Sequence, residues 1–286
     1  SDRTPDGRGR GLSALADWCG GVPGKYPSFA RNFLGCHGRS GGLGMSVAHE
    51  ERTIAVTVPK DKSEVISSFI PADFDVPTGR EEEWRFTPLR RMKPLLTALP
   101  QNDGATVEID GDPAVIGVDA AQGPIQPGEW LVPVDVVSAL AWAGAADTTL
   151  ITIPPKTDLE NPVTVTITGT STSYQKLRVT IEHDSSATVV INHQGTGQHA
   201  ENIEVEVGAR SQLKLVVIQD WDRDAVHLGR IHSHVGRDAT LTQVVATFGG
   251  DLVRLVSTVD YDGPGGSAEL LGAFFADAGQ HLEHRL

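Results

Sequence analysis

The sequence predicts a mainly β fold, a parallel β-helix whose short strands wind into stacked coils, with a small helical region before it. Beyond residue 100, short β-rich runs are separated by Gly, Asp, Asn and Pro, which is typical of strands joined by turns. In the second half these runs recur every 25–29 residues. Repetition at a nearly fixed spacing indicates a solenoid, because one such unit buries its apolar face only by stacking on its neighbours.

The first 44 residues differ in character from the rest of the chain. They are rich in Gly and Arg, contain both cysteines (Cys19 and Cys36), and show no helix or strand period. Their six Lys and Arg against three Asp and Glu give a net charge of +3, whereas the whole chain carries −13. We therefore expect 1–44 to be a disordered extension, with Met45 as the natural start.

Residues 45–100 are predicted to form a helical or irregular cap. In KDKSEVISSFI (60–70), apolar residues recur at helical spacing, with Val65, Ile66, Phe69 and Ile70 on one face.

The segment GREEEWRFTPLRRMKPLL (79–96) is predicted to contain a helix that Pro88 ends, since proline disfavours helical geometry in the residue before it. Glu81–Glu83 would form a solvated face. Trp84 and Phe86 would anchor the cap on the first β-coils.

Residues 101–286 are predicted to form the β-helix core. The first strand candidates are ATVEID, TLITIP, VTVTITG and KLRVTIEH, and one helix is predicted at VDVVSALAWAG (134–144). Two families of runs then alternate. The first family is SATVVINH (186–193), SQLKLVVIQ (211–219), DATLTQVVA (238–246) and SAELLGAFF (267–275), and the second is ENIEVEV (201–207), LGRIHSHV (228–235) and LVRLVSTV (252–259). This gives two or more strands per coil of 25–29 residues.

A β-sandwich is the alternative fold, because many short strands with regular turns fit it as well. The β-helix is favoured because both families keep the same period.

Composition restricts the class of protein. With 39% hydrophobic and 21% charged residues, the chain of 286 residues has a soluble globular composition. The net charge of −13 argues against a nucleic-acid partner, which needs a basic footprint. No apolar run approaches a membrane span, and no signal-peptide pattern appears, so we expect a cytoplasmic protein without a membrane partner.

Five late histidines are weak candidates for metal ligands: His227, His232, His234, His281 and His284. His232 and His234 are two residues apart on a predicted strand and so share a face. Together with His227 they could bind a transition metal, or they could be an ordinary hydrogen-bonded face. In QHLEHR (280–285), His281 and Glu283 share one face and His284 lies on the other.

No catalytic residue is predicted. Asp220, Asp222 and Asp224 in QDWDRDAVH could serve acid–base chemistry or calcium, but the segment is more simply a turn between coils. No activated Ser or Cys accompanies the histidines. A solenoid with long faces and no reactive centre is expected to bind partners rather than to be an enzyme.

The segment 79–96 resembles the N-terminal hallmark of the SufB/SufD family of the SUF iron–sulfur cluster assembly machinery, in its SufD branch and actinobacterial form. Further blocks resemble the family in the same order, and the resemblance covers roughly residues 60–286. They are VVINHQGTGQHAENIEVEV, VIQDWDRDAVHLGRIHSHVGRDATL, FGGDLVRL and GGSAELLGAFFADAGQHLEHRL.

The resemblance implies a right-handed parallel β-helix with helical ends. It implies pairing with a SufB-like subunit through the β-helix, and binding of a SufC-like ATPase through a C-terminal helical region. Iron or a nascent cluster would be held only within that complex, so no cofactor is expected in the isolated chain.

Members of the family continue beyond the QHLEHRL block, so the chain is expected to be truncated at its C-terminus and to lack the SufC-binding region. No cluster ligand is therefore assigned. A SufB-like subunit is the near alternative, although no cysteine follows Gly44. A β-helix carbohydrate-active enzyme is the alternative from another class. The absence of a signal pattern and of a convergent carboxylate pair disfavours it.

Overall fold

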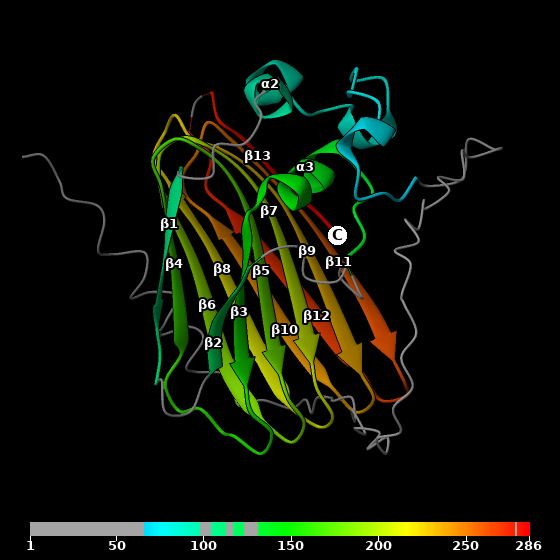
Figure 1. Ribbon diagram of the computed structural model, residues 1–286, viewed down its shortest axis with the longest axis vertical. Coiled ribbons are helices and arrows are strands. Elements are labelled where there is room, and N and C mark those ends of the chain that lie inside the picture. The colour runs from blue at the N-terminus through cyan, green and yellow to red at the C-terminus, as the bar shows by residue number, and fades with distance from the viewer. Residues whose placement is uncertain (1–65, 98–103, 113–116, 123–130, 278) are drawn as a thin grey trace, which may run out of the picture.

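The structure is a computed structural model that describes residues 66–97, 104–112, 117–122, 131–277 and 279–286. The predicted extension 1–44, its junction at Met45 and most of the predicted helix 60–70 lie outside these residues. The described chain forms two facing sheets, with short helices over one end (Figure 1).

The two sheets are the walls of a β-solenoid. The first sheet has the order β1 (Ala105–Asp110), β4 (Val163–Gly169), β6 (Ser186–Gly195), β8 (Gln212–Trp221), β10 (Thr240–Thr247) and β12 (Ser267–Phe274). The second has the order β13 (His281–Arg285), β11 (Leu252–Asp262), β9 (Val226–Gly236), β7 (Gln198–Val207), β5 (Thr172–Ile181), β3 (Asp147–Ile153) and β2 (Gly117–Gln122). From β3 onward the chain passes from one sheet to the other after every strand, so the predicted β-helix with two strands per coil is confirmed.

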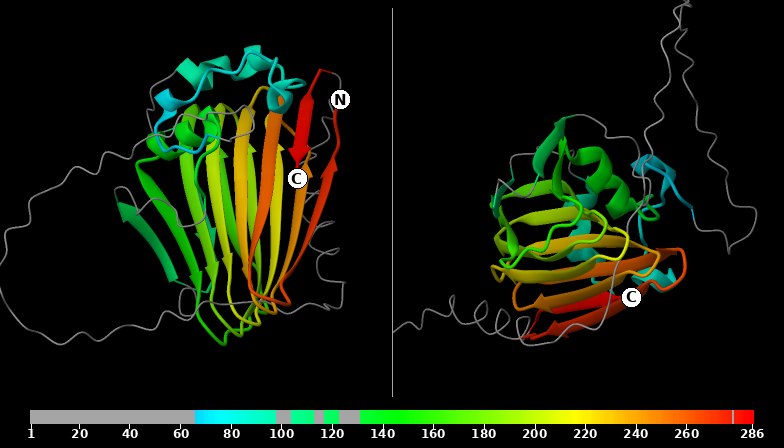
Figure 2. Two further views of the ribbon diagram at one scale, coloured as in Figure 1. Left: turned by 90° about the vertical axis from the view of Figure 1, so that its right-hand side faces the viewer. Right: turned by 90° about the horizontal axis from the view of Figure 1, so that it is seen from below.

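The coils stack in parallel register. Ser186 pairs with Gln212, Gln212 with Thr240 and Thr240 with Ser267, so successive coils are 26, 28 and 27 residues long. Seen from below, the coils follow one another in chain order through about five turns (Figure 2). The β-sandwich alternative is wrong, because the strands from β4 to β13 pair in parallel with the strand one coil away, and none of them pairs with its neighbour in sequence.

At the N-terminal end of the solenoid the strand pairing is antiparallel instead of parallel. β1 pairs antiparallel with β4, and β2 pairs antiparallel with β3, whereas the later strand pairs are parallel. The sequence had not indicated this antiparallel end.

Alternation along each strand divides interior from exterior. In β7, Ile203, Val205 and Val207 point inward and join an aliphatic core that runs through the coils. Buried Val, Ile and Leu side chains from both sheets interdigitate there, and burying each contributes about 1.5–3 kcal/mol.

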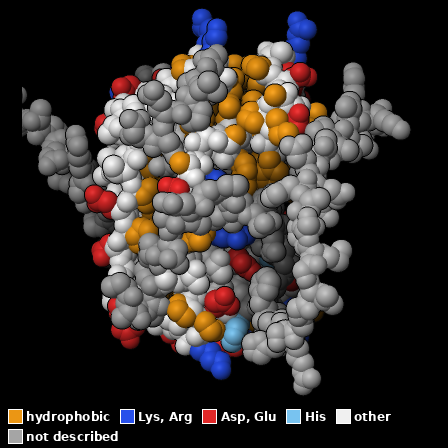
Figure 3. Space-filling view, in the orientation of Figure 1, with side chains coloured by type: hydrophobic (Ala, Val, Ile, Leu, Met, Phe, Trp, Pro, Cys, Tyr) orange, Lys and Arg blue, Asp and Glu red, His pale blue; other side chains and the backbone are white. Residues whose placement is uncertain are grey.

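Helices cover the outer face of the second sheet at one end. α3 (Val136–Gly144), predicted over 134–144, begins with a capping box in which Asp135 accepts a hydrogen bond from the Ser138 backbone N–H at 2.8 Å. The Asn202 amide of β7 donates to the Ser138 carbonyl at 2.8 Å and holds α3 against the sheet. Tyr174 of β5 likewise donates to the Leu95 carbonyl at 2.8 Å. Apolar side chains gather around this cap (Figure 3).

The cap contains two single-turn 3-10 helices, η1 (Pro71–Asp73) and η2 (Glu82–Trp84), and α2 (Leu89–Thr97). Two predictions here are wrong. The end of the predicted helix 60–70 is not helical over residues 66–70, because Pro71 restricts the residue before it. Pro88 does not end a helix but stands directly before α2, a position that tolerates its missing N–H.

The acidic run of the cap is paired more than expected. Glu81 accepts hydrogen bonds from the Thr78 hydroxyl at 2.7 Å and from the Gly79 backbone at 2.8 Å, and these bonds lower the pKa of Glu81 to about 2. Glu83 lies 3.1 Å from the Arg254 guanidinium. Glu81 and Glu82 are both exposed and fit the predicted solvated face, whereas Glu83 does not.

The aromatic anchors are also partly corrected. Trp84 is buried, with the Arg254 guanidinium 4.0 Å above its ring, but Arg254 belongs to β11 and not to the first coils. Phe86 is 75% exposed and anchors nothing among the described residues.

The basic run of the segment also holds the late coils. Arg91 donates to the Asp251 carboxylate at 3.0 Å and to the Gly279 carbonyl at 2.8 Å. Thr87 donates to Glu283 of β13 at 2.8 Å. The segment 79–96 is therefore a clamp between the cap and strands β11 and β13. None of the described helices is long and apolar enough to cross a membrane.

Candidate functional site

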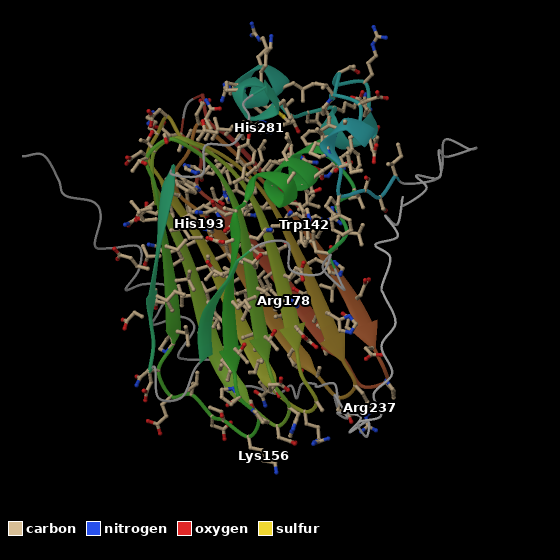
Figure 4. The ribbon with its side chains drawn as sticks, in the orientation of Figure 1. Trp142, Lys156, Arg178, His193, Arg237 and His281 are labelled. Carbon is tan, nitrogen blue, oxygen red and sulfur yellow. The ribbon has the colours of Figure 1, made fainter. Side chains whose placement is uncertain are left out.

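A cluster of polar side chains lies inside the solenoid, at the end where strands of the first sheet finish and strands of the second begin. His193 comes from the end of β6, Gln219 and Trp221 from the end of β8, and Glu201 and His227 from the starts of β7 and β9. Because interior positions alternate along each strand, all five side chains point between the sheets. We call these five residues the interior polar cluster, and Figure 4 labels His193 among them, toward the capped end.

The cluster is enclosed. His193 is 1% exposed, Glu201 2% and His227 0%. Titratable groups are rarely buried so fully unless they are paired, because removing them from water is costly.

Hydrogen bonds fix the orientation of each group. The indole N–H of Trp221 can only donate, and it lies 2.6 Å from Gln219 Oε1. Gln219 Oε1 also accepts from His227 Nδ1 at 2.7 Å, so the proton of neutral His227 is on Nδ1 and its Nε2 carries a lone pair. The Gln219 amide nitrogen, 3.1 Å from His193 Nδ1, donates to it. His193 Nε2–H then donates to Glu201 Oε2 at 2.8 Å.

Two polar atoms of the cluster are left over. His227 Nε2 lies 3.5 Å from Glu201 Oε2, beyond a good hydrogen bond, and has no hydrogen-bond partner among the described residues. Glu201 Oε1 has none either. The ligand atoms of His193, Glu201 and His227 all lie within 4.8 Å of one another.

The charge states follow from burial and neighbours. Burial lowers the pKa of His227 below its usual range and keeps the ring neutral. Burial alone would raise the pKa of Glu201, but the hydrogen bond from the neighbouring His193 holds that pKa below its usual range. The cluster therefore presents a carboxylate beside imidazole nitrogens.

A second interior pair lies one layer away. Ser173 Oγ is 2.6 Å from His199 Nδ1, and His199 Nε2 is 2.9 Å from the Thr196 carbonyl, so His199 donates to Thr196 and accepts from Ser173. The His199 ring stacks on Trp221 with 4.5 Å between ring centroids, and burial lowers its pKa to about 4. The pair resembles a nucleophile and its base, but both side chains are buried inside the solenoid.

The five histidines predicted as weak metal candidates do not form one site. His227 belongs to the interior polar cluster. His232 and His234 share the outer face of β9 as predicted, 3.4 Å from Asp260 and 3.9 Å from Asp262 respectively. The trio is therefore not brought together, because residues an odd number apart on a strand lie on opposite faces.

The other two candidates separate in the same way. His281 lies on the outer face of β13, 3.4 Å from Glu283, whereas His284 points inward and bonds Thr247 Oγ1 at 2.8 Å. Asp222 and Asp224 lie in the turn between β8 and β9, where Asp224 accepts from the Thr196 hydroxyl at 2.7 Å. The interpretation as a turn is confirmed for Asp222 and Asp224, whereas Asp220 lies in strand β8.

Sequence reasoning missed His193, Glu201, Gln219 and Trp221. A signal was present, because His193 and Gln219 are register partners in adjacent coils, as are His199 and His227. Polar residues at interior positions one coil apart meet inside the solenoid, but the interior face is known only once each strand is placed.

Comparison with known proteins matches residues 164–286 to the SufBD core domain of SUF system FeS cluster assembly. The match runs from β4 to β13, which contains the whole interior polar cluster. This part of the chain is a SufBD core domain.

Three mycobacterial relatives, each named an iron–sulfur cluster assembly SufBD family protein, are similar over most of this chain. The relative from Mycobacterium bovis is 42% identical over 233 residues, or 80% of this chain and 59% of the relative. The one from Mycobacterium tuberculosis is 41% identical over the same shares. The one from Mycobacterium leprae is 37% identical over 79% of this chain and 59% of the relative. The chain thus spans about three-fifths of the length of these relatives, and no solved structure matches it.

Proposed function

We propose that this chain is a SufD-like scaffold subunit of the SUF machinery for iron–sulfur cluster assembly. It pairs with a SufB-like subunit through the solenoid and works in the cytoplasm with a SufC-like ATPase. The observation that carries the proposal is the match of the SufBD core domain to the stacked coils from β4 to β13.

The assignment to a SufD-like subunit is supported by the cysteines. A SufB-like cluster scaffold is expected to supply thiolate ligands, since thiolates hold most iron–sulfur clusters. The two cysteines of this chain, Cys19 and Cys36, both precede the matched core domain. A SufB-like role remains the alternative for a longer form of the protein.

The role as a scaffold without catalytic activity is supported by the accessibility of the polar groups. The Ser173–His199 pair and the interior polar cluster are enclosed by the coils, so a bulky substrate does not reach them. The accessible carboxylates Asp222 and Asp224 lie in a turn. Iron or a nascent cluster is accordingly the cargo of the assembled complex, and not a substrate that this chain transforms alone.

Co-purification tests the proposal. The tagged chain is expressed together with untagged SufB-like and SufC-like proteins of the same organism, and the stoichiometry of the eluate is measured. We expect an equimolar SufB-like subunit in the eluate, and its capture is lost when excess untagged chain competes.

Circular dichroism verifies that the chain is folded. If the folded chain recovers no SufB-like subunit, the scaffold role is rejected. A glycan-cleavage assay checks the carbohydrate-active alternative on the same sample. We expect no release of reducing ends from acidic or neutral polysaccharides.

A further inference from the structure

We infer that His193, Glu201 and His227 form a binding site for one divalent first-row transition metal ion inside the solenoid, with Gln219 and Trp221 as positioning residues. The site is argued from this chain's own side chains and does not depend on the proposed partners. That the ion is iron destined for a cluster rests on the proposed function.

The separations of the three groups suit a metal ion. Ligands at about 2.0–2.2 Å from a tetrahedral ion lie roughly 3.4 Å from one another. In the structure, His193 Nε2 and His227 Nε2 lie 2.8 Å and 3.5 Å from Glu201 Oε2, and all ligand atoms fall within 4.8 Å of one another. Small side-chain rotations would bring the three donors onto one ion.

The donor set selects the class of metal. Two imidazole nitrogens and one carboxylate suit divalent iron, cobalt or zinc, whereas magnesium and calcium prefer oxygen ligands alone. Three protein ligands also leave at least one coordination position open.

The unpartnered atoms point to a missing ligand. His227 Nε2 and Glu201 Oε1 are buried without a hydrogen-bond partner among the described residues. Buried polar atoms without a partner are rare, because each costs about 1–3 kcal/mol. A metal ion bound by His227 Nε2 and Glu201 would satisfy both.

The surroundings of His227 match those of a metal ligand. Metal-binding histidines usually donate their other ring N–H to a fixed acceptor, which sets the tautomer. Here Trp221 holds Gln219 Oε1 at 2.6 Å, and Gln219 Oε1 accepts from His227 Nδ1 at 2.7 Å. The lone pair on His227 Nε2 is therefore already aimed at Glu201.

His193 needs one change to bind. Its Nε2–H now donates to Glu201, and that nitrogen must lose its proton to coordinate. When the ring takes the other tautomer, the proton lies on Nδ1, which donates to the Ile218 carbonyl 3.2 Å away and gives up the hydrogen bond that it now accepts from the Gln219 amide. The ring remains neutral, so the pair of tautomers balances without any redox step.

The test uses the full chain and Co(II) alone. Because the site is enclosed, cobalt is supplied both during expression and by titration of the purified chain, and bound metal is measured by elemental analysis and visible absorption. We expect one Co(II) per chain, with an absorption spectrum of nitrogen and oxygen ligands and a rise in melting temperature.

Three variants locate the ion. His227→Gln and Glu201→Gln are expected to abolish stoichiometric binding, and Gln219→Leu to weaken it by about 10- to 100-fold through loss of the positioning bond. The double variant His232→Gln/His234→Gln, on the outer face of the same strand β9, is the matched control and should bind cobalt as the wild type does.

X-ray absorption of the cobalt-loaded wild type counts the histidine ligands without any substitution, should a buried variant fail to fold. Two imidazoles with one carboxylate support the site. Three results would each overturn the proposed metal site. They are no stoichiometric binding by the folded wild type, unchanged binding by His227→Gln, and loss of binding in the outer-face double variant. Co-purification with the SufB-like subunit is measured separately, so the metal site and the scaffold role can fail independently.

Discussion

Trp84 and Phe86 show at the scale of single residues how two neighbouring aromatics take opposite roles. Both were expected to anchor the cap. The 3-10 turn η2 ends at Trp84 and directs that side chain under the Arg254 guanidinium, whereas Phe86 lies beyond the turn and faces solvent. One aromatic is therefore part of the cap core and the other is not.

We expect Trp84→Ala to lower the free energy of unfolding by about 3–5 kcal/mol, because it leaves a cavity and removes the aromatic partner of a buried cation. Phe86→Ala, the matched control, should change it by no more than about 0.5 kcal/mol. Denaturant unfolding of both variants measures the difference. If Trp84→Ala loses as little stability as Phe86→Ala is expected to lose, Trp84 is no anchor.

His232 predicts a pH dependence at the same scale. Burial lowers the pKa of His232, Asp260 opposes this, and Arg230 and His234 add to the lowering. The unfolded chain therefore binds a proton on this ring more readily than the folded chain. His232 thus lowers the free energy of unfolding as the pH falls below its ordinary pKa near 6.5, and contributes no further change above it.

Melting temperatures between about pH 8 and about pH 5.5 test this expectation. The wild type should lose more stability on acidification than His232→Gln does. Parallel curves for the two proteins would mean that His232 titrates alike in the folded and unfolded chains.

At the scale of elements, the turns at the end opposite the cap share one backbone feature. Lys156, Asp184, Arg210 and Asp238 stand at equivalent positions in four successive coils, each with φ of 58–60°. Lys156 is visible at that end in Figure 4. A side chain in this left-handed conformation costs about 1–2 kcal/mol relative to the right-handed one, and only glycine avoids the cost.

We expect Lys156→Gly to raise the free energy of unfolding by up to about 1 kcal/mol, since relief of strain is partly offset by the flexibility of glycine when unfolded. Lys156→Ala keeps the β-carbon and should show little change. Chemical denaturation of the two variants compares them, and a glycine variant less stable than the alanine variant would contradict the strain argument.

The strands could be predicted from the sequence, and the interior of the solenoid only in part. Alternating apolar residues and a shared period placed β4 to β13 correctly, because a strand's pattern is local. The face taken by His227 was also within reach, since it is five residues from His232. The meeting of His193, Glu201 and His227 was not, because it depends on how β6, β7 and β9 are stacked.

The clamp formed by 79–96 could not be predicted from the local sequence either, because it too depends on contacts between distant parts of the chain. The partners of Glu83 and Arg91 are Arg254 and Asp251, more than 150 residues away in the chain. Charge runs look alike whether solvent or a distant strand neutralises them. Only the packing of the cap on the late coils separates the two cases.

At the scale of the whole molecule, stability comes from the stacking of neighbouring coils. β7 and β9 are flanked on both sides by parallel strands, whereas β1 is an edge strand with mostly exposed side chains. In a stack with nearest-neighbour contacts, inner units open last.

We therefore expect hydrogen exchange to be slowest for the backbone amides of β7 and β9 and fastest, among the solenoid strands, for those of β1. Mass spectrometry of peptic fragments measures this profile. Uniform protection across all coils would indicate that the solenoid opens as one cooperative unit instead.

The unequal lengths of the coils have a consequence for how such a chain can change over generations. Coils of 26, 28 and 27 residues stack without loss of strand register, so the surplus residues are absorbed in the bends. Insertions and deletions should thus be inherited freely at the bends. One residue gained within β9 would instead shift the strand by one position, so that inward side chains such as His227 and their outward neighbours exchange faces. Descendants of this protein can therefore change in length at the bends while the enclosed side chains keep their positions in the stack.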